Sequence, residues 1–330
     1  MTRRSDPQLV FLVATNVVLL AIGALASDGI FIDPYNLQSM ASQLPELGLL
    51  AVGVSLAMIS GNGGIDLSGI ALANLAGVSA ALIAGGVLSA DDAPTAFSIV
   101  FTLAALLVGL AGGIVNGILI ARFRLTPILC TLGTQLFFTG IAVVLSGGRA
   151  LSTGSPSWLE ELGNGTVLEV PISFLVFVAI VLLIAAVLKF TPFGIRLLLL
   201  GTNPVAARYA GFAQTRMLVT TYAISGTLAG LAGVIIAARN VNVKWDYGQS
   251  YLLIAILIAV MAGVKPEGGH GRMICVLLSA TALQLMSSLL NFLELSNFFR
   301  DLAWGLLLLM FLAVIRYDLL GALTLRRKST

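Results

Sequence analysis

Few residues of this 330-residue chain have the types and spacing that enzymes use for chemistry. A loop that holds ATP phosphates needs a glycine followed by a lysine, and none of the four lysines follows a glycine. The single histidine, His270, has no nearby partner with which to bind a metal or complete a Ser-His-Asp triad. Cys130 and Cys275 lie in apolar segments and indicate neither a disulfide framework nor a zinc site. We therefore expect no catalytic residue, cofactor or metal ion.

Carboxylates and amides inside apolar segments are the remaining groups that could contact a solute. Glu46 and Asp66 are the only candidate carboxylates, and both are expected near helix ends. A carrier driven by ions would usually show several ionisable groups in mid-membrane. Neutral amides suit an uncharged, hydroxyl-rich solute, and they equally suit hydrogen bonds between helices. The candidate pathway residues are Asp66, Asn74, Asn116, Gln135 and Gln284.

The glycine-rich stretch SGNGGIDLSG at 60–69 contains one of these candidates. Its glycines let the backbone turn tightly or enter the bilayer, provided that other helices cover its polar groups. Asp66 is expected as the N-cap of the following helix, where a carboxylate meets free amides and the positive end of the helix dipole. A direct role of Asp66 in solute transit is the alternative.

A short helix is predicted inside the polar stretch 191–216, which is expected in the cytoplasm. Asn203 is expected as its N-cap, Pro204 as its first residue and Gly211 as its stop. Because so short a helix does not persist alone in water, we expect it to rest on the membrane domain. It would present small residues to a cytoplasmic partner or merely cover the bundle.

The other long polar stretch, 147–170, is expected on the outer side. The residues SPSWLEELGN predict a surface helix with Ser155 as cap, Pro156 at the first position and Gly163 as stop. Trp158 suits the membrane interface. The acidic residues of this helix would face water or a partner.

Composition shows which elements must position these groups. The chain is 58% hydrophobic and 10% charged, with a mean hydropathy of +1.02. A soluble domain needs about a quarter of its residues charged, whereas each membrane crossing uses about 20 apolar residues. These values exclude a soluble enzyme, a nucleic-acid-binding domain and a disordered protein. They predict an all-α polytopic protein in a lipid bilayer, and the lack of a polar linker predicts a single membrane domain over residues 1–330.

About ten transmembrane helices are predicted from apolar runs bounded by charges, glycine or proline. If the amino terminus is cytoplasmic, most of the 18 basic residues lie inside and only Arg149, Arg239, Lys244 and Arg300 lie outside. This positive-inside bias predicts that both termini are cytoplasmic. The first apolar stretch, about 17 residues long, exceeds a usual signal-peptide core, so we expect an uncleaved helix. The segments are 8–26, 41–60, 67–88, 96–121, 126–146, 171–190, 217–238, 250–264, 273–293 and 298–316.

Five stretches make the chain similar to the ribose-type permease family, the membrane subunits of bacterial ABC importers for simple sugars. The most specific motif runs from Gly201 to Arg208, whereas the glycine-rich turns alone are less specific. Within the first stretch the family commonly has SGGIDLSVGS, and this chain inserts Asn62 and continues Ser68-Gly69-Ile70. The stretches are ISGNGGIDLS at 59–68, GGIVNGILIARFRLTPILCTLGT at 112–134, TPFGIRLLLLGTNPVAARYAGF at 191–212, YAISGTLAGLAGVIIAAR at 222–239 and YLLIAILIAVMAGVKPEGGHGR at 251–272.

The resemblance implies a permease domain that forms half of a sugar pathway in the bacterial inner membrane. Its implied partners are a second permease copy, identical or closely related, two ABC ATPase subunits on the cytoplasmic face and a periplasmic sugar-binding protein. The chain would be a transport subunit without enzymatic activity, and ATP would be hydrolysed by the partner chains. The resemblance makes the short helix a coupling helix, with ATPase-coupling residues Gly201, Asn203, Pro204, Ala206, Ala207, Arg208 and Gly211.

Two alternatives from other classes remain open at this point. A self-sufficient secondary carrier or facilitator would move a small neutral solute without ATP. A membrane-embedded enzyme acting on lipid would need Asp66 or Glu46 as its catalytic group.

Overall fold

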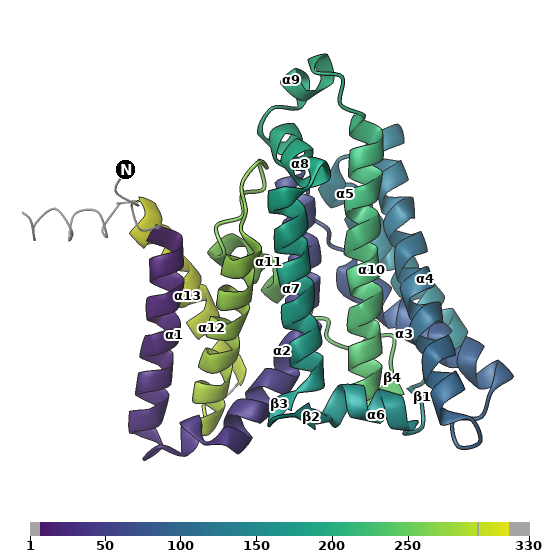
Figure 1. Ribbon diagram of the computed structural model, residues 1–330, viewed down its shortest axis with the longest axis vertical. Helices are drawn as coiled ribbons and strands as arrows, with labels where there is room; N and C mark the ends of the chain where they lie inside the picture. The colour runs from purple at the N-terminus through teal and green to yellow at the C-terminus, as the bar shows by residue number, and fades with distance from the viewer. Residues whose placement is uncertain (1–6, 296, 317–330) are drawn as a thin grey trace, which may run out of the picture.

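The computed structural model describes residues 7–295 and 297–316, and most of these residues are helical (Figure 1). Among the described residues, eight helices are long and apolar enough to cross a membrane. This confirms the prediction of an all-α polytopic membrane protein. The eight are α1 (Pro7–Ala26), α2 (Pro34–Ile59), α3 (Gly69–Val87), α4 (Pro94–Arg122), α5 (Pro127–Ser146), α7 (Ile172–Phe190), α10 (Gln214–Asn240) and α12 (Met273–Phe292).

Shorter elements and one further long helix complete the described chain. Each of the ten predicted segments contains a helix, because α11 and α13 fall in the eighth and tenth. The termini lie outside the described residues, and so do the basic residues at 3–4 and 326–328, so the sidedness of the chain stays a prediction. These elements are η1 (Ile30–Ile32), α6 (Ser157–Asn164), α8 (Pro192–Thr202), α9 (Pro204–Tyr209), α11 (Tyr251–Met261) and α13 (Asn297–Arg316).

Helices α2 and α10 form the centre of the bundle. In each of these two helices, 83% of the most apolar 18-residue stretch is buried inside the protein. In α1, α5 and α7 the buried share of the corresponding stretch is only 28%. Helix α10 lies against α4 through facing glycines: a Cβ on Gly109 would come within 2.3 Å of the Gly226 carbonyl oxygen, and one on Gly113 within 2.2 Å of the Tyr222 carbonyl oxygen. Backbones this close require small residues at the contact, so the glycines fix how α4 and α10 pack.

Two predicted crossings differ from the structure. Helix α2 begins at Pro34 rather than at 41 and continues through Pro45, so Glu46 lies in its middle and not near an end. The segment 250–264 contains only α11, which has 11 residues. At 1.5 Å per residue α11 spans about 16 Å, roughly half of a hydrocarbon core of about 30 Å. The chain therefore reaches α11 through the non-helical residues 244–250.

Residues 147–171 contain α6 and three of the four two-residue strands among the described residues. Strand β1 (Leu151–Ser152) pairs antiparallel with β4 (Asn242–Val243), and β2 (Thr166–Val167) pairs with β3 (Val170–Pro171). The β1–β4 pair holds this stretch against the end of α10, and the helix predicted in it is confirmed.

The predicted ends of α6 were wrong by one or two residues. The residue before the helix is Pro156, which makes no side-chain cap, and Ser155 does not cap it. Gly163 lies inside the helix, which ends at Asn164. A Cβ at Gly163 would come within 2.4 Å of the Ala238 carbonyl oxygen of α10. That glycine allows α6 to contact α10 instead of ending α6.

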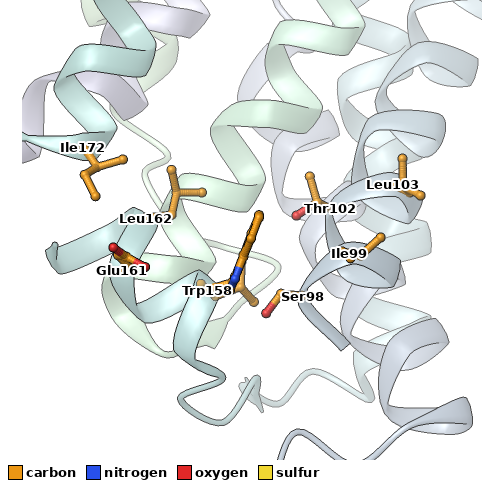
Figure 2. Close-up of a pocket in the computed structure, with 9 residues that line it drawn as sticks. Ser98, Ile99, Thr102, Leu103, Trp158, Glu161, Leu162 and Ile172 are labelled. Carbon is orange, nitrogen blue, oxygen red and sulfur yellow. The ribbon is translucent and has the colours of Figure 1, made fainter. Parts of the chain in front are cut away.

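Helix α6 also borders an apolar hollow of about 430 Å³ (Figure 2). Trp158 and Leu162 of α6 line one side, and Ile99 and Leu103 of α4 line the other. Glu160 and the neighbouring Glu161 are exposed, as predicted for the polar side of a surface helix. Since the Trp158 ring is also largely exposed, its position fits the membrane interface.

Candidate functional site

The short helix predicted from Asn203 to Gly211 is present as α9. Figure 1 shows α9 at the end of the molecule opposite α6, joined to α8 and to the start of α10. The Asn203 side-chain oxygen accepts a hydrogen bond from the Ala206 amide at 2.9 Å. Pro204 is the first helical residue, and Gly211 has a φ of +79°. Each of these local signals is confirmed, whereas α8 was not predicted as a separate helix.

Not all of the predicted coupling residues are accessible. Gly201 is buried, and Ala207 is only 4% exposed. The other five are exposed and available to a partner. They are Asn203, Pro204, Ala206, Arg208 and Gly211.

Two exposed residues of α9 were missed by the sequence analysis. Val205 is 64% exposed and Tyr209 is 90% exposed. They are four positions apart, so they share one face of the helix. Two large side chains that are mostly exposed are unusual on so short a helix. The sequence signal for this exposed face was the pair Val205 and Tyr209, four residues apart, between Asn203 and Gly211.

Gly201, in the last turn of α8, packs closely against two other turns, the one after α2 at 59–64 and the one before α12 at 266–269. A Cβ on Gly201 would come within 2.0 Å of the Ile59 carbonyl oxygen and 2.4 Å of the Gly269 amide nitrogen. The Gly269 amide donates to the Ile59 carbonyl at 3.0 Å, and the Gly63 amide donates to the Pro266 carbonyl at 3.1 Å. Close-packed backbones transmit displacement instead of absorbing it. Movement of α9 would therefore reach the end of α2 and the turn before α12.

Asp66 follows the turn at 59–64 and connects three helices. Its Oδ1 accepts hydrogen bonds from the Ser68 amide at 3.0 Å and the Ser68 hydroxyl at 2.7 Å. Its Oδ2 accepts one from the Ser225 hydroxyl of α10 at 2.7 Å, and the Asn116 side-chain amide of α4 donates to the Ser68 hydroxyl at 2.8 Å. The expected N-cap role is wrong, because α3 begins at Gly69 and its N-cap position is Ser68. Asp66 instead holds the turn before α3 against α4 and α10.

The glycine-rich stretch is covered by other helices, as its sequence required. The Thr131 hydroxyl of α5 donates to the Ile65 carbonyl at 3.0 Å and accepts from the Leu67 amide at 3.1 Å. Polar backbone groups outside a helix need such partners when they are buried.

The remaining pathway candidates lie in different surroundings. Asn74 is buried, and its side-chain amide donates to the carbonyls of Trp245 at 3.1 Å and Tyr247 at 2.9 Å. Gln135 has a buried side-chain oxygen for which the described residues supply no partner. Gln284 is partly exposed and donates to the Gln43 side chain at 3.4 Å. Asp66, Asn74 and Asn116 thus make contacts between segments, and a role in the pathway stays a prediction for all five candidates.

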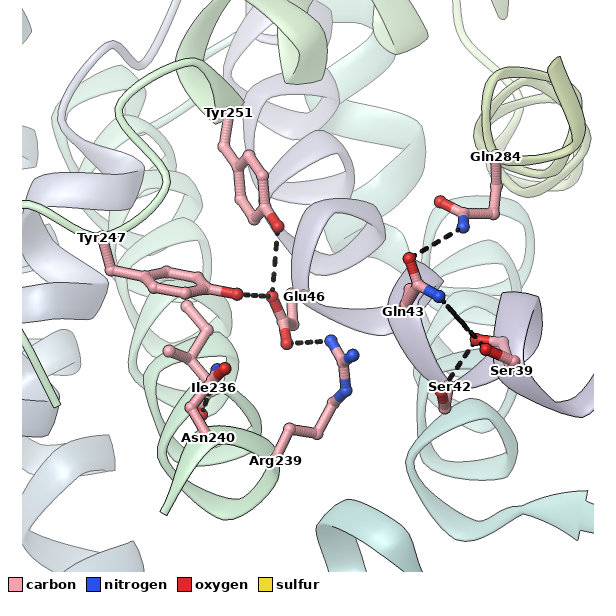
Figure 3. Close-up of polar contacts among 10 residues, drawn as sticks. All are labelled: Ser39, Ser42, Gln43, Glu46, Ile236, Arg239, Asn240, Tyr247, Tyr251 and Gln284. Carbon is pink, nitrogen blue, oxygen red and sulfur yellow. Dashed lines mark hydrogen bonds and ion pairs between the residues drawn. The ribbon is translucent and has the colours of Figure 1, made fainter. Parts of the chain in front are cut away.

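A buried charge cluster around Glu46 was missed altogether (Figure 3). The fully buried Glu46 carboxylate forms an ion pair with Arg239 of α10, whose side chain is 21% exposed. Its second oxygen accepts hydrogen bonds from the Tyr247 hydroxyl at 2.9 Å and the Tyr251 hydroxyl at 3.3 Å. The cluster joins the middle of α2, the last turn of α10 and residues 247–251 before and at the start of α11. Buried charges of this kind are stable only when paired and hydrogen-bonded.

Asn74 and the Glu46 cluster together hold the non-helical residues 244–250 and the start of the short helix α11 in place. Asn74 binds the carbonyls of Trp245 and Tyr247, while Glu46 binds the Tyr247 and Tyr251 side chains. Non-helical backbone at membrane depth is tolerated where protein side chains satisfy it, and broken helices of this kind surround solute sites in many transporters.

Comparison with known proteins shows the family of the chain. The sequence model of the family described as "Branched-chain amino acid transport system / permease component" matches residues 36–315. The chain belongs to this family. The ribose import permease protein RbsC of Bacillus subtilis is 30% identical to the chain over 284 residues, which cover 84% of each protein.

Two further relatives are similar to this permease over most of their length. RbsC of Escherichia coli K12 is 30% identical over 297 residues, which cover 89% of each chain. The autoinducer 2 import system permease protein LsrC of Yersinia enterocolitica is 32% identical over 279 residues, which cover 83% of the permease and 74% of LsrC. No solved structure matches the chain. The resemblance to simple-sugar ABC permeases is confirmed, and the chain is a multi-pass transport subunit of the bacterial inner membrane.

Proposed function

We propose that the permease forms half of a pathway for a simple sugar, powered by ABC ATPase subunits that bind α9 on the cytoplasmic side. The observation that carries this proposal is the pair Val205 and Tyr209, an exposed apolar surface on a capped helix. Buried Ala207 anchors this helix, and Gly201 joins it to the turns at 59–64 and 266–269. A force applied to α9 would therefore act on the helices that enclose the pathway.

The chain itself supplies no means to hydrolyse ATP, because no glycine-lysine phosphate loop is present in its sequence. A second copy, identical or closely related, completes the pathway, and both termini are cytoplasmic in this arrangement. Residues 1–330 act as one permease domain. A periplasmic binding protein delivers the sugar to the end that carries α6, where exposed Glu160 and Glu161 are available to it.

A simple sugar is the solute best supported by the relatives and by the interior of the bundle. Ribose is named for two of the relatives compared above. The candidate pathway residues are mostly neutral amides, whose donors and acceptors match hydroxyl groups.

Reconstitution into liposomes tests this function. With ATPase subunits, binding protein and internal ATP, the permease should take up at least one of radiolabelled ribose, xylose, fucose and galactose at least ~10-fold faster than the permease alone. The tenfold ratio corresponds to about 1.4 kcal/mol of activation free energy. Equal uptake by the permease alone, driven by a proton or sodium gradient, would establish the secondary carrier instead.

A further inference from the structure

One face of α2 carries polar side chains from the surface into the buried centre (Figure 3). Ser39, Gln43 and Glu46 follow one another at i, i+4 and i+7, which places them on the same side of the helix. Ser39 and Gln43 are exposed, and Glu46 is fully buried in the cluster with Arg239. Among the residues that the structure describes, the Gln43 amide nitrogen donates only to Ser39 on its own helix.

Gln284 of α12 lies opposite this face. Its amide donates to the Gln43 oxygen at 3.4 Å, and we call these two residues the amide pair. Gln284 is the twelfth of the 20 residues of α12, so it lies about 17 Å along that helix. The amide pair therefore lies close to the midplane of a hydrocarbon core of about 30 Å.

The exposed Gln43 and the partly exposed Gln284 at this depth do not fit a lipid-facing surface. Lipid tails offer no hydrogen-bond partner, and an unsatisfied amide in an apolar medium costs several kcal/mol. Each glutamine side chain offers two donors and an oxygen with two lone pairs, and the bond between Gln43 and Gln284 uses only part of this capacity. The amide pair thus belongs on a surface that faces water and solute.

The backbone around the amide pair has the irregularity that midplane solute sites need. Pro45 lies inside α2 two residues after Gln43 and removes one backbone hydrogen bond from the helix, because proline has no N–H for the fourth preceding carbonyl. The short helix α11 begins at Tyr251, whose hydroxyl donates a hydrogen bond to Glu46. Glu46 is three residues after Gln43 in α2. Transporter sites near the midplane are typically formed where helices are interrupted.

We propose that Gln43 and Gln284 form a sugar-binding site at the midplane of the pathway, in which their amides exchange hydrogen bonds with sugar hydroxyl groups. The identity of the solute as a sugar rests on the proposed function, whereas the exposure of the amide pair to water does not.

Cysteine reactivity tests the exposure to water without ATP, partners or a known sugar. Cys130 and Cys275 are first replaced by alanine, and Gln43→Cys and Gln284→Cys are introduced singly into the full chain in membrane vesicles. A charged, membrane-impermeant methanethiosulfonate should modify both at least ~10-fold faster than Leu107→Cys. Leu107 is a matched control, since it is 64% exposed at the middle of α4 but surrounded by apolar residues. Reactivity as low as that of Leu107→Cys would overturn the proposal.

Transport tests the contact with sugar. In the assembled complex, Gln43→Leu with Gln284→Leu should reduce uptake of the sugar that the wild-type complex transports at least ~10-fold. This tenfold loss of uptake corresponds to about 1.4 kcal/mol. Binding-protein-stimulated ATPase activity should stay within about twofold of wild type, because α9 is unchanged in this variant. Unchanged uptake would overturn the proposal, and so would failure of the two permease copies to assemble, which would make the amide pair an interface between them.

The two experiments separate failure of this site from failure of the proposed function. If the wild-type complex shows no ATP-driven uptake, the importer assignment fails. In that case, slower modification of Gln43→Cys in the presence of ribose, xylose, fucose or galactose would still support the site, and an unchanged rate with all four would overturn it.

Discussion

Arg239→Ala is expected to destabilise the permease more than any other single substitution of an Arg or Lys side chain described here. It leaves the fully buried Glu46 carboxylate without its counter-charge, and removing one member of a buried ion pair typically costs about 3–5 kcal/mol. The two tyrosine hydroxyls that also bind Glu46 do not replace a positive charge. The midpoint of thermal unfolding of the purified protein in detergent should fall clearly below that of wild type.

The control for this prediction removes both charges together. Glu46→Gln keeps a hydrogen-bond acceptor for the tyrosines, and Arg239→Met keeps most of the side-chain volume. Replacing both members of a buried pair is often close to neutral, so this double variant should be much more stable than Arg239→Ala. An Arg239→Ala variant that unfolds at the wild-type temperature would show that the pair contributes nothing.

Val205→Glu combined with Tyr209→Ala is expected to abolish sugar-coupled ATP hydrolysis. Both side chains are exposed on one face of α9, and a buried aromatic anchor at an interface commonly contributes about 2 kcal/mol or more. That energy is roughly a thirtyfold loss of affinity for the ATPase subunits. Stimulated ATPase activity and sugar uptake of the reconstituted complex should fall together by at least this factor.

Unfolding measurements separate lost coupling from lost structure. The double variant should unfold close to the wild-type temperature, because both side chains are mostly exposed. Ala207→Trp, in contrast, should lower the unfolding temperature, because Ala207 is the buried residue of α9 and overpacking a core commonly costs about 1–3 kcal/mol. Wild-type ATPase stimulation in the Val205→Glu, Tyr209→Ala variant would exclude α9 as the docking element.

Local signals in the sequence predicted the helices and α9 well. Apolar runs bounded by charges fixed the ten helical segments, because hydrocarbon burial and helix length are properties of a single segment. Asn203, Pro204 and Gly211 fixed α9, because a cap acts within one turn of the residue that forms it. Such features do not depend on contacts with neighbouring helices or strands.

Features that depend on contacts between distant segments were missed. Glu46 and Arg239 are 193 positions apart, and their contact requires α2 to begin at Pro34 and α11 to be half a crossing. Asp66 was expected to cap its own helix, but Ser225 and Ser68 bind its oxygens. Gly163 was read as a helix stop, although its role is to let α6 contact α10. In each case tertiary packing overrides the local preference.

Photo-crosslinking in intact bacteria tests most directly whether ATPase subunits act through α9. Tyr209 is replaced by p-benzoylphenylalanine, and Trp158 of α6 is replaced in the same way as a matched probe at the opposite end of the molecule. We predict that the probe at position 209 forms an adduct with an ABC ATPase subunit and that the probe at position 158 does not. An ATPase adduct from position 158, or only periplasmic adducts from position 209, would contradict the account.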